Sequence, residues 1–114
     1  MKNNEQVKYL KNYLERKREE LKKEECSLEE VKKEREDCMN TKAEIENKIK
    51  ELELKKEFSE RDVAHVESLR NALSTYEIDI LRLTGDIVSH EEMIEDLNYD
   101  IEMTEEEMKA EIDE

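Results

Sequence analysis

The chain has few side chains of the kinds that most often bind metal ions or act as nucleophiles: two cysteines and two histidines. Cys26 and Cys38 are too far apart for the Cys-x-x-Cys spacing of a zinc site, and His65 and His90 are distant from each other in the sequence. We therefore expect no metal site, and we interpret the cysteines as two reduced thiols.

Carboxylates are the most abundant reactive groups, with 34 Asp and Glu among 114 residues. Because close pairs of carboxylates occur throughout the chain, their spacing singles out no acid–base pair. The sequence also lacks a nucleophile beside a base and a glycine-rich phosphate loop, since Gly85 is its one glycine. We expect that the chain is not an enzyme and that it binds no cofactor and no small molecule.

The composition favours long helices as the elements that position these side chains. Charged residues make up 47% of the chain and apolar residues 35%, with no proline, whereas ordinary globular domains are about one quarter charged. Such a chain cannot bury a compact core of its own. High charge with few aromatic residues also occurs in disordered chains, but the wealth of Glu, Lys and Leu favours helix. The predicted fold class is all-α.

Apolar residues recur alternately every three and four positions in both halves of the chain. This is the heptad repeat of a coiled coil, in which the a and d positions form an apolar seam. In the first half the repeat starts at Val7 (a) and Leu10 (d). In the second half the predicted pairing seam contains Leu73, Ile80, Leu83, Ile87, Ile94, Leu97 and Ile101. Ile at a with Leu at d favours parallel two-stranded coiled coils, and so sustained a repeat argues against disorder.

Several seam positions are polar. Four of them fall in the first half, where they weaken the seam: Lys17, Glu24, Arg35 and Lys42. In the second half His90 occupies a d position. We interpret His90 as a polar seam residue that sets register or partner number, with a pH switch as the alternative.

The two heptad repeats are out of phase, which predicts a register shift near residues 58–69. Ser59 and Asp62 resemble a capping box at the start of a helix, and this pattern favours a hairpin that turns near Phe58 and Ser59. However, residues 55–62 (KKEFSERD) contain no glycine, proline or asparagine and consist largely of good helix formers. We expect a continuous or bent helix, and we keep the hairpin as the alternative.

Net charge divides the chain into two halves. Residues 1–57 hold sixteen Lys/Arg and sixteen Asp/Glu, whereas residues 58–114 hold four Lys/Arg and eighteen Asp/Glu. We describe these ranges as a charge-balanced coiled-coil half and an acidic Ile/Leu coiled-coil half. The acidity argues against binding to nucleic acid or to an anionic membrane surface, and it favours a basic partner.

Three apolar residues of the second half lie off the seam: Ile78, Leu81 and Val88. They widen the apolar face of the helix, which suits contact with a further helix. Scattered surface residues are the alternative interpretation. The partner is expected to be another helix, either from a second copy in a homodimer or from a more basic chain in a heterodimer.

The pattern resembles the broad class of coiled-coil scaffold proteins found in cytoskeletal, axonemal, centrosomal and kinetochore assemblies. The resemblance implies a structural element for oligomerisation, scaffolding or spacing. The alternative is an antiparallel helical hairpin that acts as a binding module, as an adaptor or a chaperone arm does. No run of about 18 apolar residues and no signal peptide is present. We therefore expect an intracellular location, cytoplasmic or nuclear.

Overall fold

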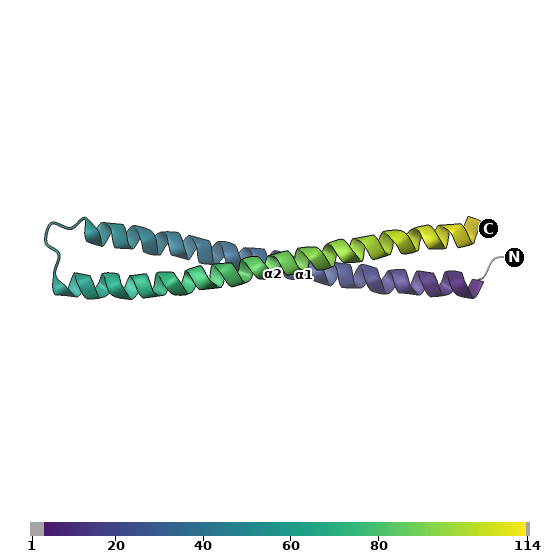
Figure 1. Ribbon diagram of the computed structural model, residues 1–114, viewed down its shortest axis with the longest axis horizontal. Coiled ribbons are helices and arrows are strands. Elements are labelled where there is room, and N and C mark those ends of the chain that lie inside the picture. The colour runs from purple at the N-terminus through teal and green to yellow at the C-terminus, as the bar shows by residue number, and fades with distance from the viewer. Residues whose placement is uncertain (1–3, 114) are drawn as a thin grey trace. The chain divides into compact units, whose positions relative to one another are not determined.

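A computed structural model describes residues 4–113, which form two helices and no strand. Helix α1 spans Asn4–Glu53, helix α2 spans Glu60–Asp113, and residues 54–59 form the loop between them (Figure 1). The prediction of an all-α, two-stranded coiled coil is confirmed. The expectation of a continuous or merely bent helix is wrong, because the helix ends at Glu53 and a new one starts at Glu60.

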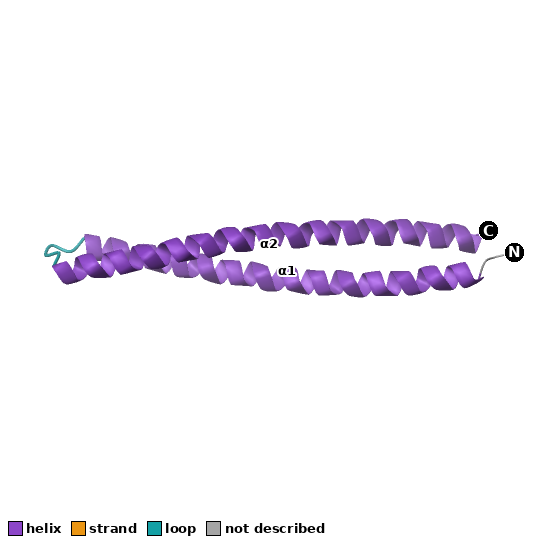
Figure 2. Ribbon diagram, turned by 60° about the horizontal axis from the view of Figure 1, so that its bottom comes forward, coloured by secondary structure: helices purple, strands orange, loops and turns teal. Residues whose placement is uncertain are grey.

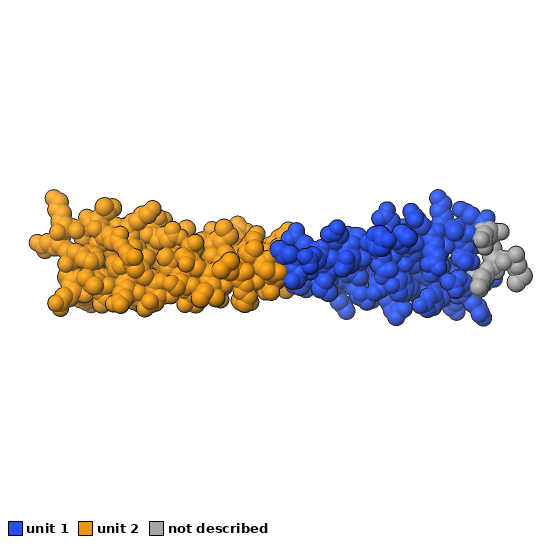
Figure 3. All heavy atoms as spheres, in the orientation of Figure 1, with its two compact units in different colours: residues 1–29, 88–114 blue, residues 30–87 orange. Residues whose placement is uncertain are grey.

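The chain forms two compact units, and each contains a stretch of both helices. Unit 1 comprises residues 1–29 and 88–114, of which 4–29 and 88–113 are described, and unit 2 comprises residues 30–87 (Figure 3). Within each unit the α1 and α2 stretches lie side by side (Figures 1 and 2). These units do not follow the division by charge into 1–57 and 58–114, which remains a description of the sequence.

Unit 1 pairs its two helical stretches in opposite directions. The Tyr13 hydroxyl donates to Asp100 at 2.5 Å, and further along α1 Glu24 lies 2.6 Å from His90. As the residue number in α1 rises from 13 to 24, the residue number of the α2 partner falls from 100 to 90. The two stretches therefore pair in an antiparallel direction. The buried side chains of this unit are Leu10, Leu14, Leu28, Ile101 and Thr104.

Unit 2 contains the loop and pairs in the same sense. Lys42 lies 3.9 Å from Glu77, and nearer the loop Arg70 donates to Glu53. Its buried apolar side chains are Ile49, Leu52, Val66, Leu83 and Ile87. Burial of one such side chain contributes roughly 1.5–3 kcal/mol, so the seam is the main source of stability in a chain with so few apolar residues.

The start of α2 is capped by a reciprocal pair of hydrogen bonds. The Asp62 backbone N–H donates to the Ser59 hydroxyl at 3.2 Å, and the Ser59 backbone N–H donates to the Asp62 carboxylate at 3.1 Å. Lys55 reaches the same carboxylate at 3.1 Å. These bonds satisfy backbone donors that the first turn of a helix leaves without partners.

The loop turns without the residues that turns usually require. In residues 4–113 no residue, glycine or otherwise, has a positive φ. The absence of glycine, proline and asparagine from residues 55–62 was therefore no obstacle to a turn. The capping box was the informative signal, and the change of heptad register falls at the loop rather than within an overwound helix.

Asp62 makes the cap sensitive to acid. The Ser59 backbone N–H, followed by Lys55 and the Ser59 hydroxyl, lowers the pKa of Asp62 below its usual value. Its contribution to stability is therefore present above the pKa that Asp62 has in the unfolded chain, and it is lost as pH falls through the lower folded pKa. The melting temperature of the wild type should exceed that of Asp62→Asn at neutral pH, and the gap should close below about pH 4. Circular dichroism melting curves from neutral to acid pH measure this gap; a gap that stays constant would contradict the assignment.

Gly85 lies in α2 without a conformational or steric reason to be glycine. Its φ is not positive, and a Cβ built on it meets nothing within 4 Å. Gly85→Ala should therefore raise the free energy of unfolding by about 1 kcal/mol through helix propensity alone. Ala43→Gly, at an exposed position of α1, is the converse control and should lower it by a similar amount. Urea titration measures both; a destabilised Gly85→Ala would show that the backbone at Gly85 needs its freedom.

Candidate protein-binding site

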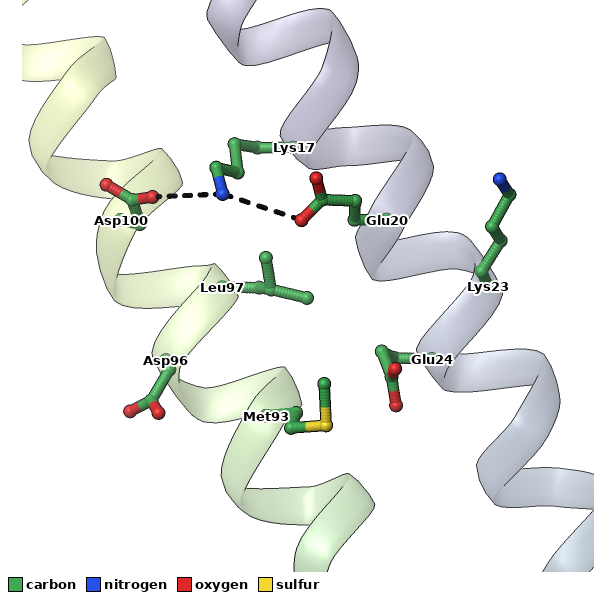
Figure 4. Close-up of a pocket in the computed structure, with 8 residues that line it drawn as sticks. All are labelled: Lys17, Glu20, Lys23, Glu24, Met93, Asp96, Leu97 and Asp100. Atoms are coloured by element: carbon green, nitrogen blue, oxygen red, sulfur yellow. Dashed lines mark hydrogen bonds and ion pairs between the residues drawn. The ribbon is translucent and has the colours of Figure 1, made fainter.

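A groove of about 500 Å³ lies between α1 and α2 in unit 1 (Figure 4). The α1 side supplies only charged residues, and the α2 side supplies two apolar residues and two carboxylates. The lining residues are Lys17, Glu20, Lys23 and Glu24 from α1 and Met93, Asp96, Leu97 and Asp100 from α2. In Figure 4 the Leu97 and Met93 side chains extend from α2 into the space between the helices.

The heptad explains why a groove forms at this place. Lys17 and Glu24 occupy d positions of α1, where a coiled coil normally has apolar side chains. Because both are charged, no apolar α1 side chain lines the groove beside Leu97 and Met93. Leu97 stays half-buried although it occupies a seam position, and Met93 is 49% exposed. The groove is therefore a gap in the apolar seam.

Charged groups surround the apolar floor of the groove. The Lys17 amine lies 3.5 Å from Glu20 and 3.9 Å from Asp100. Asp100 also accepts the hydrogen bond from Tyr13, and this bond raises the pKa of Tyr13 above its usual value. Asp96 makes no ion pair within the part of the chain that the structure describes. The lining contains four carboxylates and two amines, so the groove has a negative formal charge.

His90 and Glu24 form a pair at the edge of this gap. The imidazole Nδ1 lies 2.6 Å from the Glu24 carboxylate, and both side chains are half-buried. The interpretation of His90 as a polar seam residue did not identify its partner. Both residues are polar exceptions in the heptad, and only an antiparallel alignment would have brought them together.

All residues of the predicted pairing seam are buried or half-buried. Leu83, Ile87 and Ile101 are buried, and Leu73, Ile80, Ile94 and Leu97 are half-buried. By contrast, the predicted partner-helix contact is exposed: Ile78 at 66%, Leu81 at 74% and Val88 at 49%. Ile78 and Leu81 belong to unit 2, and Val88 is the first residue of the second stretch of unit 1.

The groove itself was missed by sequence reasoning. The signal was present in Lys17 and Glu24, which were recognised as weak seam positions but not as a site. Tyr13, Lys23 and Met93 were not identified either. They lie off the a and d positions, and their place beside the groove depends on the antiparallel alignment of the helices.

The two cysteines lie in different units. Cys26 is exposed in unit 1, Cys38 is half-buried in unit 2, and neither forms a disulfide. Among residues 4–113 no group of three or more His, Cys, Asp or Glu side chains is arranged to hold a metal ion. Neither helix, within the same range, contains a segment long and apolar enough to cross a membrane.

Comparisons of the chain with protein-family models, with curated proteins and with solved structures find no match.

The His90–Glu24 pair provides a test of the cost of polar seam residues. Replacing a buried ion pair by apolar residues often stabilises a protein by about 1–4 kcal/mol. Because this pair is only half-buried and is an ion pair only when His90 is protonated, we expect the double variant Glu24→Leu/His90→Leu to gain about 1 kcal/mol, at the low end of that range. Each single variant leaves one polar partner in the seam, so the two single effects should add up to less than the double effect. Urea titration of all four proteins measures this, and a double variant less stable than wild type would contradict it.

Proposed function

We propose that the chain is an antiparallel helical hairpin that binds other proteins, as an adaptor or scaffold element of an intracellular assembly does. One observation carries the proposal. The side chains of the apolar seam are buried or half-buried against the chain's own helices, while large apolar side chains on α2, above all Leu81 and Ile78, remain exposed. Exposed apolar residues at helical spacing are typical of surfaces that contact another helix.

A structural role through dimerisation of the seam is the competing proposal. A second chain could pair with this seam only if the hairpin opened, because Leu83 and Ile87 are already buried within unit 2. Opening would expose these side chains before the new contacts formed. The internal seam therefore favours a binding module that uses its outer surface over a dimerisation element that uses its seam.

Light scattering distinguishes these two functions. A binding module should have the mass of one chain, 13.7 kDa, over a wide range of protein concentrations. Twice that mass at all concentrations would favour the dimerisation element and overturn the proposal.

The outer surface is tested by substitution. The double variant Ile78→Ser/Leu81→Ser should lose a partner that the immobilised wild-type chain captures from cell extract. Met103→Ser is the matched control, since Met103 is also an exposed apolar residue of α2, and it should retain that partner. Equal capture by all three proteins would contradict a contact at Ile78 and Leu81.

A further inference from the structure

We infer that the groove of unit 1 is a docking site for a basic amphipathic helix of a partner protein. The inference rests on the proposed function, a protein-binding hairpin, and adds a second surface and the chemistry of its occupant. Its two supports are the apolar side chains of Leu97 and Met93 that line the open groove and the negative charge of the unit around it.

The apolar floor requires an apolar cover. Leu97 and Met93 project into the groove, and the four α1 residues that line it are all charged. A helix with Leu or Ile at alternating spacings of three and four residues would place an apolar stripe over this floor and complete the seam. The described part of the chain walls the groove with α1 and α2 alone. An open groove of this kind suits a helix better than a small molecule, which is usually surrounded on most sides.

The charge of unit 1 selects a basic helix. Residues 88–113 hold eleven Asp/Glu and a single basic residue, Lys109, whereas residues 4–29 hold seven Asp/Glu and seven Lys/Arg. The described part of unit 1 therefore has a net charge of −10. The imbalance comes entirely from the α2 stretch, which supplies Asp96 and Asp100 to the groove. Lys or Arg beside the apolar stripe of the partner would lie against these carboxylates.

Lys17 adds little positive charge to the groove. Lys17 is held between Glu20 and Asp100, which neutralise it. Asp96 has no ion pair among the described residues and is exposed, so it remains available to a cation. Each exposed ion pair is worth only about 0.2–1 kcal/mol. The carboxylates therefore select the partner and speed its association, and the apolar floor supplies most of the affinity.

A synthetic peptide tests the inference directly. The probe is a three-heptad helical peptide with Leu at a and d and Lys at e and g, labelled for fluorescence anisotropy and titrated with the full chain. The comparison peptide has Glu in place of each Lys. The Lys peptide should bind, with an affinity that falls as salt is added, and the Glu peptide should not bind. Absence of binding by the Lys peptide, or equal binding by both peptides, would overturn the inference.

Two matched pairs of variants separate docking in the groove from general attraction to an acidic protein. Asp96→Lys should weaken binding of the Lys peptide by roughly tenfold, since it replaces an attraction by a repulsion at the groove. Glu102→Lys makes the same charge change at an exposed α2 residue that does not line the groove, and should have a much smaller effect. Met93→Ser should weaken binding more than Met103→Ser. Equal effects within both pairs would overturn docking in the groove.

A spectroscopic readout locates the bound peptide. The methyl resonances of Leu97 should shift on addition of the Lys peptide, while those of Leu83, buried in unit 2, should not. Circular dichroism confirms that each variant keeps its helix content, and all four substituted residues are exposed. A chain that is monomeric but does not bind the peptide overturns this inference and leaves the proposed function standing, whereas a constant dimer overturns the proposed function.

Discussion

The pairing of one apolar stripe with another is the constraint from which the rest of this structure follows. With apolar residues at only 35% of the chain, neither helix can bury its stripe by itself, and no third layer is available among residues 4–113 to cover it. The chain meets the constraint by folding back, so that α1 and α2 cover each other's seams within each unit. The loop and its cap allow this pairing, and the groove of unit 1 is a place where the pairing is incomplete.

The heptad repeat was sufficient to predict helices and their two-stranded pairing. Periodicity is a local property, and residues such as Ile80, Leu83 and Ile87 show it directly in the sequence. The turn was harder to predict because two local signals disagreed. Lys55, Lys56 and Glu57 have high helix propensity, whereas Ser59 and Asp62 match a capping box, and a match of this kind also arises by chance in a chain rich in Glu. The structure shows that the capping bonds form and that tertiary pairing of the seams outweighs propensity in the loop.

The groove could not be predicted, since it is a property of the alignment between two distant stretches. Lys17 and Glu24 were visible as charged residues at seam positions, but their effect depends on which α2 residues lie across from them. Only the antiparallel alignment puts them beside Leu97 and Met93. The same alignment pairs Glu24 with His90, so that one polar exception is satisfied by another while Met93 nearby stays exposed. Polar residues in a seam thus cost stability and at the same time create a surface with a defined chemistry.

The antiparallel connection also has a consequence for the order of folding. Contacts in unit 2 join residues that are close in the sequence, such as Glu53 and Arg70, 17 positions apart. In unit 1 the separation is 66 positions for Glu24–His90 and 87 for Tyr13–Asp100. The entropic cost of closing a loop rises with its length, and long-range contacts form later than local ones. Once unit 2 has formed, most of the intervening chain is already ordered, and unit 1 needs to close only what remains. We therefore expect unit 2 to form before unit 1 and unit 1 to open first. The groove lies in unit 1, where we expect local opening to cost less than in unit 2, and such opening would ease adjustment to a partner helix.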